Sequence, residues 1–145
     1  MANVISNVFK EELLKGNHDF DGGATYKLAL YTSSKTVAAS DPTAYNTTNQ
    51  VANGNGYTTG GATLANPSVT GGSSASTAFV DFDDVSFTSA SFTARFAQIY
   101  RSVGSAPTNN SVLVLDFGGD FTATNGTFTI QFPAADTSNA VLRLA

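Results

Sequence analysis

Residues 79–103, FVDFDDVSFTSASFTARFAQIYRSV, restrict the fold more than any other part of the chain. Apolar and polar residues alternate in the first part of this segment, which is typical of a β-strand with one buried face. From residue 92 onward both faces carry apolar residues, which indicates a strand covered on both sides or a bulge that reverses the register. We interpret the segment as strands joined by a short polar turn at residues 89–91.

Several further segments have the composition and alternation of strands. An Asn-Gly pair at residues 125–126 is a strong hairpin signal, and we expect a Gly/Ser turn at residues 70–76 and a loop at 104–110. Six to eight strands without β–α alternation predict a mainly β fold: one antiparallel β-sandwich, jelly-roll-like, spanning residues 1–145. The additional strand segments are residues 25–32, 60–69, 78–82, 111–117, 127–132 and 139–144.

One N-terminal amphipathic helix is predicted over residues 3–15, within a segment that spans residues 1–16. Its apolar residues recur at spacings of three and four, as on one face of a helix, and a glycine follows at residue 16. We expect this helix to cover the open end or face of the sheet, or to dock on a neighbouring subunit. The predicted apolar face consists of Val4, Ile5, Val8, Phe9, Leu13 and Leu14.

Residues 33–61 are the least regular part of the chain and are rich in Asn, Thr, Gly and Ala. Loops longer than about 12–15 residues in compact domains are often functional or contact partners. We therefore consider this segment either a long interface loop or a mobile surface loop, and the residues alone do not choose between the two.

The composition excludes several classes of function. Only 12% of the residues are charged, the net charge is −4, and the seven basic residues are scattered, which disfavours a nucleic-acid-binding surface. The chain has no cysteine, so thiolate metal sites and cysteine nucleophiles are excluded. The N-terminus does not resemble a signal peptide, and no apolar run approaches the length of a membrane span. We expect a protein made in a cytoplasm that does not bind membranes.

Three aspartates, Asp81, Asp83 and Asp84, form the densest acidic group. Paired carboxylates can bind Ca²⁺ or transfer protons, but neither an EF-hand spacing nor a second acidic pair lies nearby in the sequence. We expect these side chains to lie at a solvated strand edge or to pair with Arg95 or Arg101.

The remaining candidates for chemistry are weaker. His18 is the only histidine, and no serine lies in a nucleophile-elbow motif, so a catalytic triad is not predicted. Residues 116–118, Asp-Phe-Gly, spell a kinase tripeptide but lack every accompanying kinase motif. The sequence predicts no catalytic residue, no metal ligand and no cofactor.

Four sequence blocks together carry a family resemblance. They are YKLALYTS, NGYTTGGATL, DFDDVSFTSASFTARFAQIY and VLVLDFGGDFTATNGTFTIQF, and with the N-terminal helix they cover most of the chain. This pattern resembles small structural proteins of tailed bacteriophages, which are described as head-decoration, cement or minor structural proteins, or as tail-fibre-associated proteins.

The resemblance implies a non-enzymatic capsid decoration protein on the capsid surface of a virion, made in the host cytoplasm. Its partner would be the major capsid protein, whose shell it would stabilise, and it would assemble as a homo-oligomer, with a trimer favoured. We expect the contacts to come from the long loop and the helix, specifically from Tyr45, Tyr57, Val4, Val8 and Phe9.

Two alternatives stay open at this point. One is a tail-fibre or baseplate-associated protein that contacts the host surface, because a tyrosine-bearing loop and Gly/Thr-rich turns fit that role equally well. The other is a small glycan-active enzyme, which the cluster of Asp81, Asp83 and Asp84 alone suggests.

Overall fold

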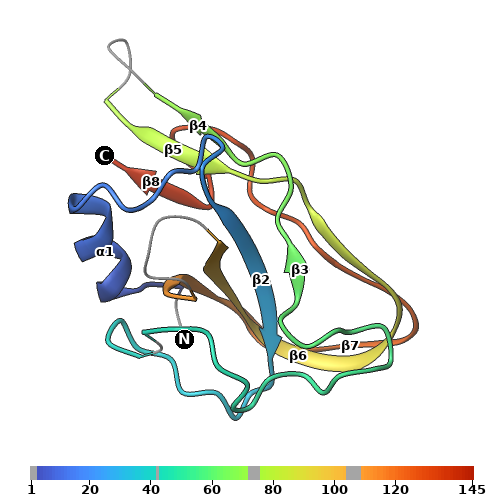
Figure 1. Cartoon of the computed structure of the whole chain (residues 1–145). Helices are drawn as coiled ribbons and strands as arrows, with labels where there is room; N and C mark the ends of the chain where they lie inside the picture. The colour runs from blue at the N-terminus through green and yellow to red at the C-terminus, as the bar shows by residue number, and fades with distance from the viewer. Residues whose placement is uncertain (1–2, 42, 72–75, 104–108) are drawn as a thin grey trace.

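The computed structural model describes residues 3–41, 43–71, 76–103 and 109–145 (Figure 1). The fold is mainly β, with two antiparallel sheets and one short helix near the N-terminus, which confirms the predicted fold class. Most of the predicted turn at residues 70–76 and of the predicted loop at 104–110 lies outside the described residues.

The larger sheet has five strands and the smaller sheet has three. In the larger sheet the strand order is β1-β7-β6-β2-β3, and in the smaller sheet it is β4-β5-β8. The elements in chain order are β1 (Val4–Ile5), α1 (Asn7–Leu14), β2 (Thr25–Tyr31), β3 (Ala62–Thr63), β4 (Ser68–Thr70), β5 (Ala78–Asp81), β6 (Val85–Val103), β7 (Ser111–Ile130) and β8 (Leu142–Leu144).

β6 and β7 are two long strands that pair with each other along most of their length. The turn predicted at residues 89–91 and the hairpin predicted at residues 125–126 are both wrong, because each lies inside one of these strands. The turn-forming residues produce local bends in the strands instead. Ser89 has φ 52° and Asn125 has φ 49°, and the pairing register shifts on both sides of Ala90. Such bulges bend a strand without ending it.

The bend folds the β6–β7 pair back on itself. The rings of Phe117 and Phe128, both on β7, have centroids 6.2 Å apart, whereas eleven residues of straight strand would span about 36 Å. The two limbs of the bent pair therefore face each other (Figure 1), and the main hydrophobic core lies between them and under the smaller sheet. That core includes Leu28, Leu30, Tyr57, Phe82, Val85, Phe87, Ile99, Leu113, Phe128 and Ile130.

The outer face of the larger sheet is also covered. A second buried cluster there contains Tyr31 and Tyr100. The irregular segment of residues 33–61 lies over it: the Tyr45 ring stacks on Tyr100 with centroids 4.5 Å apart, and the Lys35 ammonium lies 3.7 Å from the centre of the Tyr31 ring. The sequence predicted that β6 is either covered on both sides or reversed in register by a bulge. Both features occur, because each face of β6 is covered and the strand also contains bulges.

The helix starts later than predicted. α1 begins at Asn7, while Val4 and Ile5 form strand β1 and pair with Val114 and Leu113 of β7. β-branched residues favour strands, and the edge of β7 offers unpaired backbone groups to them, so the long-range pairing outweighs the local helical spacing.

The orientation of α1 predicts unequal effects of two substitutions. Phe9 is 1% exposed and Leu14 is 91% exposed, although both belong to the predicted apolar face. We expect Phe9→Ala to lower the free energy of unfolding by about 3–5 kcal/mol and Leu14→Ala to change it by less than about 0.5 kcal/mol. Urea unfolding followed by circular dichroism measures both, and similar losses in the two variants would contradict this orientation.

Gly61 allows the chain to approach β2 closely. Its φ is +78°, and a Cβ at this position would lie 1.8 Å from the carbonyl oxygen of Leu28. Gly118 has a similar φ of +82° but no atom near its Cβ position. We expect Gly118→Ala to cost about 1 kcal/mol and Gly61→Ala to cost at least about 3 kcal/mol, because β2 must also move. Thermal unfolding of the two variants compares them, and equal costs would mean that the close approach is not rigid.

Candidate functional site

A groove of about 700 Å³ opens between the two limbs of β7. It lies on the outer edge of the bent β6–β7 pair, where β1 pairs only with Leu113 and Val114 and no other described strand covers β7. The core of the sandwich is therefore accessible from this side. The groove is lined by Asn3, Leu115, Asp116, Phe117, Phe121, Thr122, Ala123, Thr127, Phe128, Thr129, Ile130, Gln131, Phe132 and Pro133.

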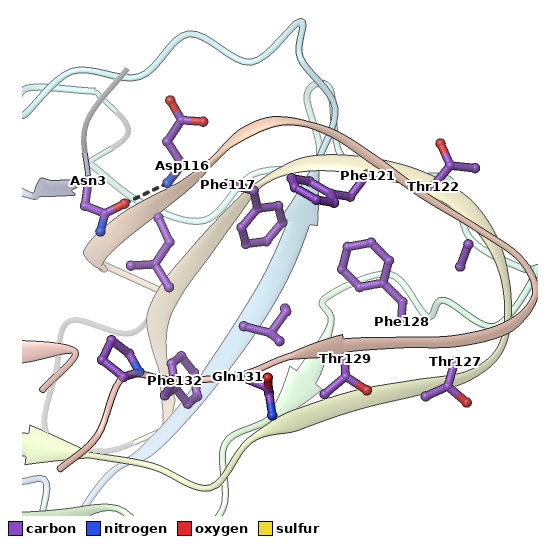
Figure 2. Close-up of a pocket in the computed structure, with 14 residues that line it drawn as sticks. Asn3, Asp116, Phe117, Phe121, Thr122, Thr127, Phe128, Thr129, Gln131 and Phe132 are labelled. Atoms are coloured by element: carbon purple, nitrogen blue, oxygen red, sulfur yellow. Dashed lines mark hydrogen bonds between the residues drawn. The ribbon is translucent and has the colours of Figure 1, made fainter. Parts of the chain in front are cut away.

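Four phenylalanines dominate the interior of the groove. Figure 2 shows the rings of Phe117 and Phe121 on one limb and of Phe128 further along β7, with Phe132 at one end. Phe117 meets Phe121 edge to face at 6.3 Å, and Phe121 remains 54% exposed. Phe128 is buried beneath these rings. The groove thus presents an exposed aromatic side chain above a fixed aromatic floor.

A large bulge in β7 builds this arrangement. Ala94 pairs with Phe121 and Phe96 pairs with Asp116, so residues 117–120 of β7 lie opposite the single residue Arg95. The Gly118 backbone takes the positive φ that this excursion requires. Because of this bulge, Phe117 and Phe121 line the groove and do not follow the regular alternation of a paired strand.

Asp116 fixes the start of the bulge. Its Oδ1 accepts hydrogen bonds from the Gly118 N–H at 2.9 Å and from Arg95 Nε at 3.3 Å, and its own N–H donates to Asn3 Oδ1 at 2.9 Å. Burial opposes ionisation of the carboxyl, but these donors outweigh it and hold the pKa of Asp116 below its ordinary value. Asp116 is therefore an ionised structural anchor.

The rim of the groove is polar and uncharged. Thr122 Oγ1 lies 2.6 Å from Thr93 Oγ1, and Thr129 Oγ1 lies 2.9 Å from Ser86 Oγ, so these hydroxyls pair across β6 and β7. Among the lining residues that the structure describes, Asp116 is the only one with an ionisable side chain, and it is already paired with Arg95. This chemistry suits the binding of apolar or aromatic groups and offers no proton-transfer or nucleophilic pair.

The predicted interface tyrosines hold the long loop against the sheet. Tyr57 is 2% exposed, and its hydroxyl oxygen accepts hydrogen bonds from the Leu30 N–H at 3.0 Å and from Gln50 Nε2 at 2.7 Å. Burial raises the pKa of Tyr57 to about 12. Tyr45 is half-buried on Tyr100 and donates to Gln50 Oε1 at 3.2 Å. Neither side chain extends from the surface.

The predicted helix residues are also largely inside the protein. Val4 is half-buried in β1, Val8 is half-buried on α1, and Phe9 is buried in the main core. We therefore look for a contact surface in the groove, which the sequence reasoning missed. In the sequence, the only indication of this groove is that Phe117 and Phe121 flank a segment with two glycines.

The acidic cluster divides among separate local roles. Asp83 accepts a hydrogen bond from Asn66 Nδ2 at 2.5 Å, and Asp84 Oδ1 accepts one from the Phe132 N–H at 2.9 Å. The described ion pairs of the two arginines go to other residues: Arg95 pairs with Asp116 and Arg101 approaches Glu12. Asp83 and Asp84 are exposed, as the alternative of a solvated strand edge predicts. Within the described residues, no group of three or more His, Asp or Glu side chains is placed to hold a metal ion.

The chain has no match among known proteins in the three comparisons. No protein-family model matches it, no curated protein sequence matches it, and no solved structure matches its fold. In the part of the chain that the structure describes, no helix has the length and apolarity to cross a membrane. The resemblance to phage virion proteins therefore stays a hypothesis.

Tyr57 provides a test of how the long loop is fastened. Tyr57→Phe leaves the buried Leu30 N–H without its acceptor, so we expect a loss of about 1–3 kcal/mol in the free energy of unfolding. Tyr45→Phe is the matched control, because its hydroxyl bonds only to the part-exposed Gln50, and should cost less than about 1 kcal/mol. Guanidinium unfolding measures both. An unchanged stability in Tyr57→Phe would show that the loop is held by packing alone.

Proposed function

We propose that this protein is a non-enzymatic structural protein of a tailed-bacteriophage virion, a capsid decoration protein that binds the shell of major capsid protein. The observation that carries the proposal is the open aromatic groove along β7, in which the exposed Phe121 ring contacts the half-buried Phe117 ring and Phe117 in turn contacts the buried Phe128 ring. The four sequence blocks that resemble phage structural proteins supply the identity of the partner.

The chemistry of the groove favours a protein partner. The centres of protein interfaces are enriched in aromatic residues and depleted of charge, and the groove combines four phenylalanines with an uncharged rim. Among its described lining residues only Asp116 carries an ionisable side chain, so few charged side chains need to lose their water on binding. An apolar or aromatic segment of the shell protein is the occupant that we propose.

The proposed mechanism is stabilisation by mass action. A protein that binds assembled shells, but not free shell subunits, shifts the equilibrium toward the shell in proportion to its affinity and concentration. No bond is made or broken, and no cofactor takes part. The homotrimer implied by the resemblance would multiply the affinity of each groove by presenting several grooves at once.

Phe121 is the residue whose substitution tests this function. We expect Phe121→Ser to weaken co-sedimentation with purified empty shells at least about tenfold, which corresponds to about 1.4 kcal/mol. Val103→Ser is the control, because Val103 is also exposed, at 60%, but lies outside the groove lining. Circular dichroism should show both variants folded. Equal binding by the two variants would exclude the groove as the contact surface.

The copy number in purified virions separates the capsid from the tail. A decoration protein should be present in amounts comparable to the major capsid protein on a denaturing gel. A small number of copies per particle would place the protein in the tail, fibre or baseplate and overturn the capsid assignment, whatever the result for Phe121.

A further inference from the structure

A buried polar cluster lies where α1 meets the larger sheet. It combines Glu12 of α1, His18 of the following connector, Tyr26 of β2, Arg101 of β6 and Asn110 just before β7. The side chains of His18 and Arg101 are 0% exposed and that of Glu12 is 5% exposed. Ionisable side chains this deeply buried are uncommon unless they are paired.

Glu12 is the centre of the cluster. Its Oε2 lies 2.8 Å from His18 Nε2, and its Oε1 accepts a hydrogen bond from Asn110 Nδ2 at 2.6 Å. Arg101 Nη2 lies 3.8 Å from the same Oε1, and Arg101 Nη1 donates to the Asn17 carbonyl oxygen. The helix is thus joined through one carboxylate to the connector, to β6 and to the start of β7.

The contacts of His18 favour a neutral ring. Nδ1 lies 3.0 Å from the Tyr26 hydroxyl, and Nε2 faces Glu12. A neutral imidazole satisfies both contacts, with Nε2–H donating to the carboxylate and Nδ1 accepting from the hydroxyl. A second proton on Nδ1 would require the Tyr26 hydroxyl to change from donor to acceptor, and it would add a positive charge close to that of Arg101.

Burial also disfavours the charged ring. It lowers the pKa of His18, the charge of Arg101 acts in the same direction, and Glu12 opposes them only in part. The charged groups that face the cluster are Glu12 from α1, Arg101 from β6 and Asp19 from the connector, the last of which acts on Tyr26. No further ionisable partner of His18 lies among the described residues.

The polar cluster adds to the apolar packing of Phe9 and Leu13 in holding α1 on the larger sheet. α1 has eight residues, too few to be stable alone, and Phe9 packs edge-on against the His18 ring at 4.7 Å. Beside it, a cleft of about 270 Å³ separates α1 and the connector from the smaller sheet. The cleft is lined mainly by apolar side chains, which include Leu13, Phe20, Val80 and Leu142.

We propose that Glu12, His18, Tyr26 and Arg101 form an acid-sensitive latch, in which protonation of His18 releases α1 from the larger sheet and exposes the apolar cleft. In the released state His18 is in water and takes up a proton with its ordinary pKa of about 6.5. The latch therefore contributes its full stability above that pH, and the contribution falls as the pH decreases below it. This inference does not depend on the proposed virion function.

The size of the effect follows from proton linkage. The ordinary pKa of the released ring sets an upper limit: its proton uptake can raise the equilibrium for release of α1 by at most about 25-fold between pH 7 and pH 5. Carboxyl groups with ordinary pKa values near 4 remain ionised across this range. His18 is the only histidine, and histidine is the side chain whose ordinary pKa lies in this window.

Two measurements on the unmodified protein test the latch. A single imidazole Cε1–H resonance should titrate by NMR with a pKa below 6.5. Amide hydrogen exchange, corrected for its intrinsic pH dependence, should accelerate in residues 7–17 as the pH falls from 7 to 5, while exchange in the centres of β6 and β7 stays constant. A histidine pKa at or above 6.5, or equal acceleration across the sheet, would overturn the proposal.

Two variants separate titration from packing. His18→Gln keeps hydrogen-bonding capacity but cannot take up the proton, so the acceleration in residues 7–17 between pH 7 and pH 5 should disappear. Tyr26→Phe removes the donor to Nδ1, so the pKa of His18 should rise and the pH dependence of exchange should become shallower. If His18→Gln does not fold, Tyr26→Phe and the unmodified protein still decide. The same pH dependence in every variant would contradict the latch.

Discussion

The bend in the β6–β7 pair is the constraint on which the rest of the structure depends. It places two limbs of one strand pair opposite each other, so the same pair supplies a large part of the main core and the open side of the groove. The bend needs Ser89 and Asn125 in the left-handed backbone region and register shifts around Ala90. A straight pair of the same strands would leave Phe117 and Phe128 far apart and would have neither a two-layer core nor a groove.

The two faces of the larger sheet are stabilised in different ways. The inner face packs aliphatic and aromatic side chains between the limbs. The outer face is closed by an irregular loop through stacking of Tyr45 on Tyr100 and through hydrogen bonds from the Tyr31 and Tyr100 hydroxyls to loop carbonyls. The cluster at α1 uses a third means, a buried ion pair with a neutral histidine. Proteins in which apolar residues replace a buried ion pair are often as stable or more stable. Stability alone therefore does not explain such a cluster, whereas a response to pH does.

Alternation predicted the mainly β fold and most strand positions, since it records which face of a strand is buried. It did not predict the bend, because Asn-Gly and Ser-Ala-Ser have the same local chemistry in a turn and in a bulge, and only the pairing partner decides. The predicted start of α1 was wrong for a similar reason. Val4 and Ile5 fit the apolar face of a helix, but they pair with the edge of β7, which is more than a hundred residues away in the sequence. The groove combines residues from two limbs that no local pattern brings together. His18 gave no signal because its partners Glu12 and Tyr26, six and eight residues away, belong to a helix and a strand that only the tertiary fold brings together.

The groove lies along β7, whereas the latch only adjoins that strand through Asn110, which precedes it. This placement gives them different relations to the fold. β1 pairs with the first limb of β7, Asn3 accepts a hydrogen bond from Asp116 at the start of the groove, and α1 follows β1 after Ser6. Release of α1 therefore affects β1 and Asn3, which lie at one end of the groove. The aromatic rings of the groove belong to β7 and the segment after it, and their positions do not depend on α1. Protonation of His18 should consequently alter one end of the groove and leave its rings in place, so a pH effect on binding there would come through β1 and Asn3.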